Sequence, residues 1–357
     1  MRYQQTKIVR IDAGHPDPAI IEQAAALLRA GELVVFPTET VYGLGADALQ
    51  PSAVERIFAA KERPYSDPLI AHIADEDTLE LLAAEISPQA RRLARVFWPG
   101  PLTLILPANP RVSRLVTAGL PTVAVRMPRH TVALALIRAA GTPVAAPSAN
   151  RFMHVSPTTA QHVYADLNGR VPLILDSGPC EVGVESTILD LCAAVPTILR
   201  PGGISLEALR SVLPEVQPPV RRRAAAEGGQ SEGEVQKSPG QMLTHYAPAI
   251  PSYLFEGPPE KMRQAMLAEV RRRQAGGEQV GVLVADEDVA TFRESGAHIY
   301  ALGSTPEQIA TRLFAGLRVL EDSGVQVILC RSFDEKGLGL AIRDRLLKAT
   351  GGRTVST

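Results

Sequence analysis

Apolar and polar residues follow two alternating periods through the first part of the chain. Short apolar runs predict strands at 33–36, 69–73, 102–106, 122–127, 144–146, 173–175 and 187–191. Helical spacing of apolar residues predicts helices at 19–30, 53–62, 88–97 and 132–140. Strands and helices that interleave in this way are typical of an α/β domain.

The pattern changes after residue 216. Residues 217–240 are rich in Gly, Pro, Ser, Glu and Arg and contain little to bury, which predicts a flexible linker. Beyond it, near-continuous apolar strands alternate with helices, as in a small parallel sheet covered on both faces. These strands are expected at 280–284, 299–302 and 325–329, and the helices near 287–295 and at 306–323 and 338–349. We therefore expect a larger α/β domain at 1–216, a linker and lid at 217–248, and a smaller Rossmann-like parallel α/β domain at 249–357.

The charge balance argues against a protein that clamps a polynucleotide. The chain has 357 residues with 37 basic and 38 acidic side chains, so its net charge is −1, whereas nucleic-acid clamps carry excess positive charge. The arginines at 221–223 could touch RNA, but a solvated charge run in a linker is the commoner explanation. Direct tRNA binding is therefore expected to be weak or absent.

Cysteine usage and hydropathy bear on the compartment. Cys180, Cys192 and Cys330 are far apart and odd in number, which fits a reducing compartment rather than a disulfide framework. The sequence contains neither an apolar signal core nor a run long enough to span a bilayer. We expect a cytoplasmic protein without membrane association.

The first candidate motif is V-F-P-T-E-T-V-Y-G-L-G-A-D at 35–47. Gly43 and Gly45 imitate a dinucleotide-binding fingerprint, but the acidic residue expected after the next strand is missing, because Asp67 precedes that strand. A nicotinamide or flavin site is accordingly disfavoured, and the polar loop before Gly43 keeps its own candidate chemistry.

Lys61 stands at an unusual place. It continues the apolar stripe of the helix at 53–62, although residues 1–215 contain 17 arginines and only one other lysine, Lys7. A lysine that snorkels from a helix end is the plain alternative. The rarity of lysine favours an ammonium kept for anion binding, with Arg63 as a fork for phosphate or carboxylate.

Two further motifs place polar groups beside small residues. In the strand at 122–127, Thr122 and Arg126 share one face, which looks into solvent or into a site. After the strand at 144–146, Ser148 and Asn150 offer a hydroxyl and an amide for a phosphate or ribose, although an ordinary Ser/Asn turn has the same pattern.

Two polar segments remain, at 176–187 and at 238–248, and the second carries a histidine and a tyrosine suited to a lid. The phosphate-loop, zinc-protease and nucleophile-elbow motifs are absent from the sequence, as is any Cys/His cluster with metal spacing.

Considered together, these motifs resemble one family, the threonylcarbamoyl-AMP synthases, in the long form that joins a YrdC-type domain to a smaller C-terminal domain. The matches occur in family order across residues 20–250. They are P-T-E-T-V-Y-G-L at 37–44, K-E-R-P-Y-S-D-P-L at 61–69, W-P-G-P-L-T-L-I-L at 98–106, T-V-A-V-R-M-P at 122–128, A-P-S-A-N at 146–150, S-P-T at 156–158, G-V-E-S-T-I at 183–188, L-R-P-G at 199–202 and S-P-G-Q-M-L-T-H-Y-A-P at 238–248.

The resemblance implies a YrdC-like twisted, mixed open sheet with helices and a nucleotidyltransferase activity. L-threonine, bicarbonate and ATP would give threonylcarbamoyl-AMP and pyrophosphate. The product would pass to a tRNA threonylcarbamoyl-transfer complex for N6-threonylcarbamoylation of adenosine. Mg²⁺ would be held by the nucleotide phosphates, with no metal ligand from the protein.

The resemblance also implies roles for single residues. Those implied to act in catalysis are Lys61, Arg63, Ser148 and Asn150. Those implied to bind ATP are Lys61, Arg63, Asp67, Thr122, Ser148, Asn150, Ser156, Arg200, His245 and Tyr246. Those implied to bind threonine are Thr40, His72, Arg126, the backbone at Ala146, and Ser186. Asp67 departs from the family, which usually has Asn there, so that a carboxylate would lie near phosphates or face Mg²⁺.

Two other hypotheses remain to be distinguished. A non-catalytic RNA-binding module would bind tRNA without ATP turnover, but only 4% of the residues are aromatic, which leaves few stacking platforms. A carbamoyl-transfer module, as in hydrogenase-maturation proteins, would bring acylphosphatase and zinc-finger regions that this sequence lacks.

Overall fold

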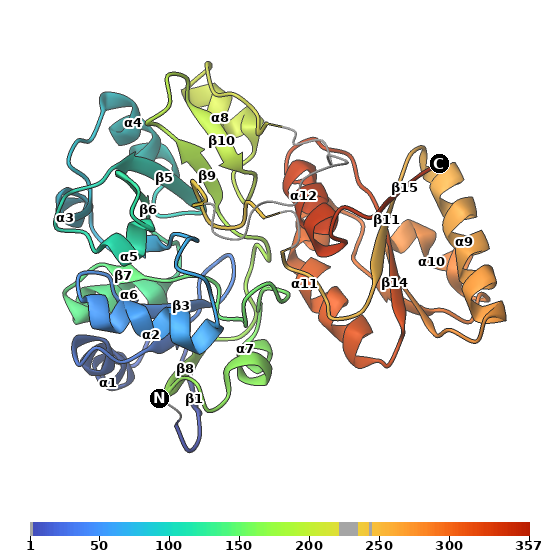
Figure 1. Ribbon diagram of the computed structural model, residues 1–357, viewed down its shortest axis with the longest axis horizontal. Helices are drawn as coiled ribbons and strands as arrows, with labels where there is room; N and C mark the ends of the chain where they lie inside the picture. Colours follow the sequence, from blue (N-terminus) through green and yellow to red (C-terminus); the bar gives the residue numbers. More distant parts are fainter. Residues whose placement is uncertain (1–2, 221–234, 243–244) are drawn as a thin grey trace. The chain divides into compact units, whose positions relative to one another are not determined.

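The computed structural model describes residues 3–220, 235–242 and 245–357. Two compact units form: Met1–Phe152, Ser156–Glu181 and Glu185–Gln241 make the first, and Met153–Val155, Val182–Val184 and Met242–Thr357 make the second (Figure 1). The continuous part of the second unit begins at Met242, and the expected boundaries at 216 and 248 stay predictions. Part of the expected linker, with the arginines at 221–223, lies outside the described residues.

The first unit is built on a ten-stranded mixed sheet. Its order is β1-β8-β2-β3-β7-β4-β6-β5-β9-β10, with both parallel and antiparallel neighbours. The strands are β1 (Lys7–Arg10), β2 (Val34–Phe36), β3 (Gly43–Asp47), β4 (Ile70–His72), β5 (Leu102–Pro107), β6 (Thr122–Arg126), β7 (Val144–Ala145), β8 (Leu173–Asp176), β9 (Thr187–Asp190) and β10 (Thr197–Arg200).

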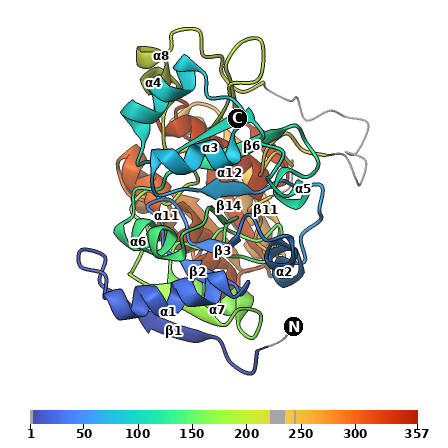
Figure 2. The ribbon, with the colours of Figure 1, turned by 90° about the vertical axis from the view of Figure 1, so that its left-hand side faces the viewer.

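Helices pack on the sheet in two apolar clusters. They are α1 (Pro18–Arg29), α2 (Pro51–Lys61), α3 (Leu79–Leu82) after a 3-10 turn (Glu76–Thr78), α4 (Pro88–Phe97), α5 (Arg114–Thr117), α6 (Thr131–Ala140), α7 (Ala160–Leu167) and α8 (Leu206–Val212). Helices α1 and α6 pack together near β2 (Figure 2), and their apolar residues cluster with those of β2 and β8. Helices α2, α4, α7 and α8 contribute to the larger core. The expected mixed α/β architecture is confirmed.

All seven strands and all four helices expected before the linker are present, and β1, β3 and β10 were not expected. Gly43 and Gly45, which imitate a dinucleotide-binding fingerprint in the sequence, belong to β3. A Cβ at Gly45 would lie 2.8 Å from the Phe36 ring and 2.9 Å from the Val144 side chain. That glycine therefore permits close packing across the centre of the sheet rather than the approach of a pyrophosphate.

The second unit contains a five-stranded, wholly parallel sheet with the order β13-β12-β14-β11-β15. Its strands are β11 (Ser252–Glu256), β12 (Val280–Val284), β13 (His298–Ala301), β14 (Val327–Arg331) and β15 (Thr354–Ser356). Its helices are α9 (Pro259–Ala275), α10 (Val289–Phe292) after a 3-10 turn (Asp286–Asp288), α11 (Pro306–Asp322) and α12 (Gly339–Ala349). Helices α9 and α10 lie on one side of the strands and α11 and α12 on the other (Figure 1), which confirms a small parallel sheet covered on both faces.

Among the described residues, no helix is both long and apolar enough to cross a bilayer.

Candidate active site

Two candidate side chains and a third polar residue share one row across the sheet of the first unit. In the strand register Arg126 of β6 lies between His72 of β4 and Thr103 of β5. Residues that pair directly across strands project on the same face. The pattern in the strand at 122–127 had placed Arg126 on a face opposite Val123 and Val125, and those two valines indeed belong to the main core.

Arg126 is 4% exposed and faces two acceptor groups. Its Nε donates to the Gly100 carbonyl at 3.3 Å, and its Nη2 lies 2.7 Å from Oε1 of the fully buried Glu39. Burial, and secondarily the charge of Arg126, lowers the pKa of His72 to about 3. His72 is therefore neutral at physiological pH, and Arg126 supplies the positive charge of this row.

Ser186 links the row to a second arginine. Its hydroxyl lies 2.7 Å from the Thr103 hydroxyl, and Arg200 donates from Nη2 to the Ser186 carbonyl at 3.1 Å and to the Ser186 hydroxyl at 3.2 Å. Arg200 also donates from Nη1 to the Pro239 carbonyl at 3.5 Å. Two buried guanidinium groups therefore flank one hydroxyl pair, an arrangement suited to an anionic ligand.

The loop between β2 and β3 supplies Thr40 and Glu39. The Thr38 hydroxyl accepts from the backbone N–H groups of Thr40 and Val41 at 3.1 and 3.2 Å and lies 2.8 Å from the Thr40 hydroxyl. Such a local side-chain bond fixes the turn. Ala146 donates its backbone N–H to the Ile70 carbonyl at 2.9 Å, so its backbone lies next to β4.

Lys61 ends α2 and is 1% exposed. Its Nζ donates to the Ser148 carbonyl at 2.6 Å and to the Asn150 carbonyl. Burial, followed by the charge of Arg63, lowers its pKa well below the ordinary value. The structure thus joins two motifs that lie far apart in the sequence, and the snorkelling alternative is excluded because the ammonium points inward.

The turn that receives Lys61 is closed by its own side chains. The Ser148 hydroxyl donates to the Asn150 side-chain carbonyl at 2.6 Å, and the Asn150 amide donates to the Arg151 carbonyl at 2.8 Å. Glu62, next to Lys61, has φ +57°, a left-handed conformation. This residue redirects the chain, so that Arg63 leaves the helix axis and faces the following loop.

Arg63 and Asp67 form a buried ion pair. Arg63 Nη2 lies 3.0 Å from Asp67 Oδ2 and donates to the Pro68 carbonyl at 2.7 Å. Burial raises the pKa of Asp67, and Arg63, Lys61 and Arg200 oppose that shift, in that order. Because Lys61 and Arg200 also act on this carboxylate, one acidic group lies within the field of three cations.

Thr122 begins β6, four residues before Arg126, which corresponds to about 13 Å along a strand. Continuing the pairing of Ile70 with Ala124 back by two residues places Thr122 beside Pro68, the acceptor of Arg63. Thr122 is therefore on the Arg63 side of the face rather than in the row with Arg126. Between the two ends, Ile70 and Ala124 belong to a small apolar cluster.

Ser156 donates its hydroxyl to Glu185 Oε1 at 2.6 Å, and both residues are buried in the first unit. His245 and Tyr246 belong to the second unit, where the Tyr246 ring packs near Phe314 at 5.6 Å and below Arg345 at 5.1 Å. Their expected contact with a nucleotide stays a prediction.

Three buried residues in this neighbourhood were not selected from the sequence. Glu39 and Thr103 lie inside the quoted motifs P-T-E-T and W-P-G-P-L-T, and Glu185 lies inside G-V-E-S-T. Each partners a selected residue, namely Arg126, Ser186 and Ser156 respectively. A buried partner leaves no periodic trace in the sequence; the only available signal was a polar residue inside a motif.

The described residues include no group of three or more His, Cys, Asp and Glu side chains suited to a metal ion. Asp67, which the sequence placed near phosphates or Mg²⁺, lies 3.0 Å from Arg63. That Mg²⁺ is held by the nucleotide phosphates stays a prediction.

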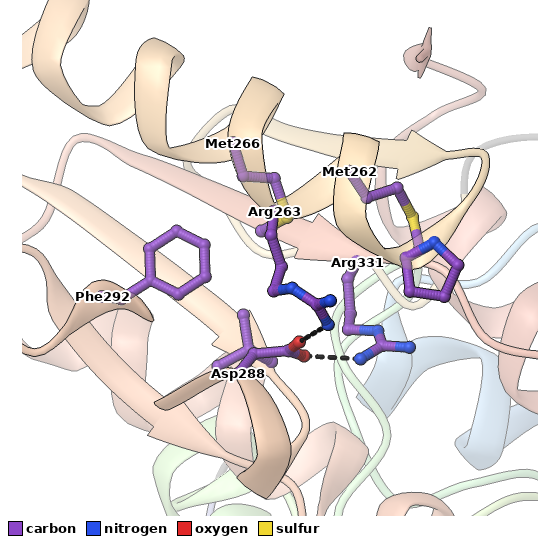
Figure 3. Close-up of a pocket in the computed structure, with 8 residues that line it drawn as sticks. Met262, Arg263, Met266, Asp288, Phe292 and Arg331 are labelled. Atoms are coloured by element: carbon purple, nitrogen blue, oxygen red, sulfur yellow. Dashed lines mark hydrogen bonds and ion pairs between the residues drawn. The ribbon is translucent and has the colours of Figure 1, made fainter. Parts of the chain in front are cut away.

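A separate charged cluster lies in the second unit, at the carboxyl ends of β12 and β14. Asp288 is fully buried and lies 3.1 Å from Arg263 and 2.6 Å from Arg331 (Figure 3). Met262, Met266 and Phe292 line the same small space. Because both cations already have a carboxylate partner, this cluster ties α9 to the strand ends.

Asp288→Ala is expected to destabilise the second unit by about 1–3 kcal/mol, because it removes the buried carboxylate that two arginines share and leaves each with only its more exposed partner, Glu260 or Glu287. Hydrogen exchange of the β12 and β14 amides measures the loss. Glu260→Gln is the control, since Glu260 pairs with Arg263 at an exposed position and should change exchange little. Equal protection in both variants would contradict the assigned role.

Comparisons with known proteins agree with this geometry. A family model described as Telomere recombination matches residues 26–202, and one described as Threonylcarbamoyl-AMP synthase, C-terminal domain, matches residues 204–351. The threonylcarbamoyl-AMP synthase of Pyrococcus abyssi is 46% identical over 335 residues, which cover 94% of this chain and 95% of that protein. The chain belongs to the threonylcarbamoyl-AMP synthase family. The expected family is therefore confirmed, and a relative from Bacillus subtilis is 45% identical over 340 residues, with 95% of each protein covered.

Solved structures of the family share the fold. The crystal structure of P. abyssi Sua5 complexed with L-threonine has a TM-score of 0.90 and 44% identity, and covers 99% of this chain and 100% of that one. A P. abyssi Sua5 variant with a histidine and a tyrosine replaced by alanine has a TM-score of 0.89 and 42% identity, and covers 99% of this chain and 98% of that one. Family members are enzymes named as synthases, which favours catalysis over the non-catalytic RNA-binding alternative.

Proposed function

We propose that this chain is a nucleotidyltransferase that makes threonylcarbamoyl-AMP and pyrophosphate from L-threonine, bicarbonate and ATP. The observation that carries the proposal is one sheet face with Arg126, His72 and Thr103 in a row and Arg63 towards the other end of β6. Such a face can hold an amino acid and a polyphosphate together. The P. abyssi relative was crystallised with L-threonine, which supports threonine as the substrate.

Each end of the face takes one part of the reaction. Arg126 binds the threonine carboxylate, with Thr40, His72, Ser186 and the backbone at Ala146 around the rest of the molecule. Arg63 and Arg200 bind phosphates. Lys61 holds the turn of Ser148 and Asn150, whose side chains face the nucleotide, while Thr122, Ser156, His245 and Tyr246 add further nucleotide contacts.

The chemistry then asks mainly for orientation and charge neutralisation. The threonine amine attacks bicarbonate carbon and water leaves, which gives a carbamate. A carbamate oxygen then attacks the α-phosphorus of ATP, and pyrophosphate departs with the bonding electrons. Fixed guanidinium groups stabilise charge that develops on the phosphates. Bound to the phosphate oxygens, Mg²⁺ would neutralise part of that charge.

The product would serve N6-threonylcarbamoylation of tRNA adenosine through a separate transfer complex. This step, and a cytoplasmic location, remain proposals from the sequence.

Pyrophosphate release tests the proposed function. We expect release from ATP and Mg²⁺ only when both L-threonine and bicarbonate are present, with serine in place of threonine as the control. ATP that stays intact under every condition would overturn the proposal, and salt-dependent tRNA binding would then favour the RNA-binding alternative.

Asp67→Asn is expected to tighten ATP binding severalfold, because it removes a carboxylate from the group of cations assigned to the phosphates and keeps the shape of the side chain. Calorimetric titration with and without Mg²⁺ measures the change. Weaker binding only in the presence of Mg²⁺ would show instead that Asp67 faces the metal. Asp75→Asn, at an exposed pair with Arg138, is the control.

A further inference from the structure

Glu39 is a fully buried carboxylate with one charged contact. Its Oε1 lies 2.7 Å from Nη2 of Arg126, and neither oxygen has a hydrogen-bond donor with good geometry among residues 3–220, 235–242 and 245–357. Burying a carboxylate is costly unless its partner is well placed. Glu39 is not among the site residues predicted from the sequence, and the proposed reaction does not use it.

We infer that Glu39 is a positioning residue for substrate recognition, which fixes Arg126 so that one edge of the guanidinium stays directed at the carboxylate of the amino-acid substrate. The guanidinium group of Arg126 has three nitrogen atoms. Glu39 occupies Nη2 and the Gly100 carbonyl occupies Nε. Nη2 meets Glu39 as an ion pair without a hydrogen bond of good geometry, whereas Nη1 has neither an ion pair nor a hydrogen bond within the described part of the chain, so Nη1 is the nitrogen offered to a ligand. The inference rests on the proposed function, which assigns threonine to Arg126.

The loop before β3 gives Glu39 the rigidity that this role needs. Thr38 and Thr40 flank Glu39, and the Thr38 hydroxyl bridges the backbone of Thr40 and Val41. Thr38 and Thr40 are themselves buried. A carboxylate on a turn closed in this way cannot follow a displaced arginine, and Gly100 holds the arginine from the other side.

The electrostatics of the pair suit the substrate class. Glu39 and Arg126 together are neutral, and an amino acid enters as a zwitterion without net charge. Burial of such a ligand beside a neutral pair leaves no uncompensated charge. An unpaired Arg126 would attract the ligand carboxylate but repel its ammonium group. Glu39 thus raises the affinity of the site for the amino acid by fixing the position of Arg126 rather than by adding charge.

Two substitutions separate position from charge. Glu39→Asp keeps the negative charge but withdraws the carboxylate by one methylene, about 1.5 Å. Glu39→Gln removes the charge but leaves an oxygen at the same reach. We expect the threonine Kd to rise about tenfold to a hundredfold in Glu39→Asp and much less in Glu39→Gln. Calorimetry with a non-hydrolysable ATP analogue present measures both values.

L-threoninamide, which lacks the carboxylate, is the matched probe. Glu39→Asp should leave its Kd unchanged, so that the preference of the wild type for threonine collapses in this variant. Glu181→Asp, at an exposed pair with Arg129, is the control variant. The double variant Glu39→Asp with Arg126→Ala should bind threonine no more weakly than Arg126→Ala alone.

The possible failures differ from one another. A wild type that binds no threonine would refute the proposed function. A wild type that binds threonine, with Glu39→Gln weak and Glu39→Asp normal, would refute the positioning role in favour of charge. Equal losses for threonine and threoninamide would also refute it. Unchanged threonine affinity in both variants, with lower melting temperatures, would leave Glu39 a purely structural residue.

Discussion

Lys61→Met is expected to reduce threonylcarbamoyl-AMP formation about a thousandfold. The Lys61 Nζ donates to the carbonyls of Ser148 and Asn150. These two residues form the turn that is assigned to the nucleotide. Loss of one preorganised donor typically costs 10²–10³-fold in rate, and here the turn itself also loses its anchor. Methionine keeps the volume of the buried stem, whereas Lys61→Ala would open a cavity and confuse stability with catalysis. Single-turnover pyrophosphate release measures the effect.

Lys7→Met is the matched control, because Lys7 is the other lysine of residues 1–215 and lies exposed on β1. It should retain full activity. The activity of Arg63→Ala is expected to fall as that of Lys61→Met does, since Arg63 is assigned to the phosphates. Turnover that persists in both Lys61→Met and Arg63→Ala would remove this pair from the mechanism.

Arg126→Ala is expected to raise the threonine KM more than a hundredfold while ATP binding stays close to that of the wild type. Arg126 supplies the positive charge in its row across the sheet, because His72 is held neutral by burial. A bidentate or charge-assisted contact to a carboxylate is among the stronger interactions available to a ligand. Initial rates over a wide threonine range, with ATP affinity measured separately, test the expectation.

Arg129→Ala provides the comparison, as Arg129 lies three residues further on with its side chain 60% exposed. Its kinetics should match the wild type. If Arg126→Ala lowered ATP affinity and left the threonine KM alone, the two ends of the sheet face would have to exchange their assignments.

Elements with strong periodicity could be predicted from the sequence. The runs at 102–106 and 280–284 consist mostly of apolar residues that favour strands, and in the structure they form β5 and β12. The helix at 88–97 coincides with α4, because Ser87 caps its first turn and Pro88 begins it. In these segments local preference and tertiary burial point to the same answer.

Elements whose residues are chosen by their neighbours could not be predicted. β3 reads G-L-G-A-D, a turn-like sequence, and Gly45 is required by the Phe36 ring on the adjacent strand. α9 buries only Met262, Met266 and Val270 along seventeen residues, so its apolar stripe was too thin to detect. Tertiary contact overrides local preference in both cases.

The candidate site was predicted as a set of residues but not as a set of pairs. The motifs selected Lys61, Arg126 and Asp67, yet the carbonyl acceptors of Lys61 and the carboxylate behind Arg126 follow from chain packing alone. The ion pair of Asp67 with Arg63 is a pairing that neither motif spacing nor charge could specify, because it depends on the left-handed turn at Glu62.

The strand order of the first unit has a consequence for synthesis of the protein. β1 pairs with β8 and β5 pairs with β9, so neighbours in the sheet are separated by many residues of chain. Such long-range pairing slows folding, because the entropy of closing the intervening loops is lost before the strands form their contacts. Ser186 and Arg200 arrive at the end of this sheet. A growing polypeptide therefore has no complete substrate site until the segment beyond Arg200 has left the ribosome, and threonine or ATP can stabilise only the finished sheet.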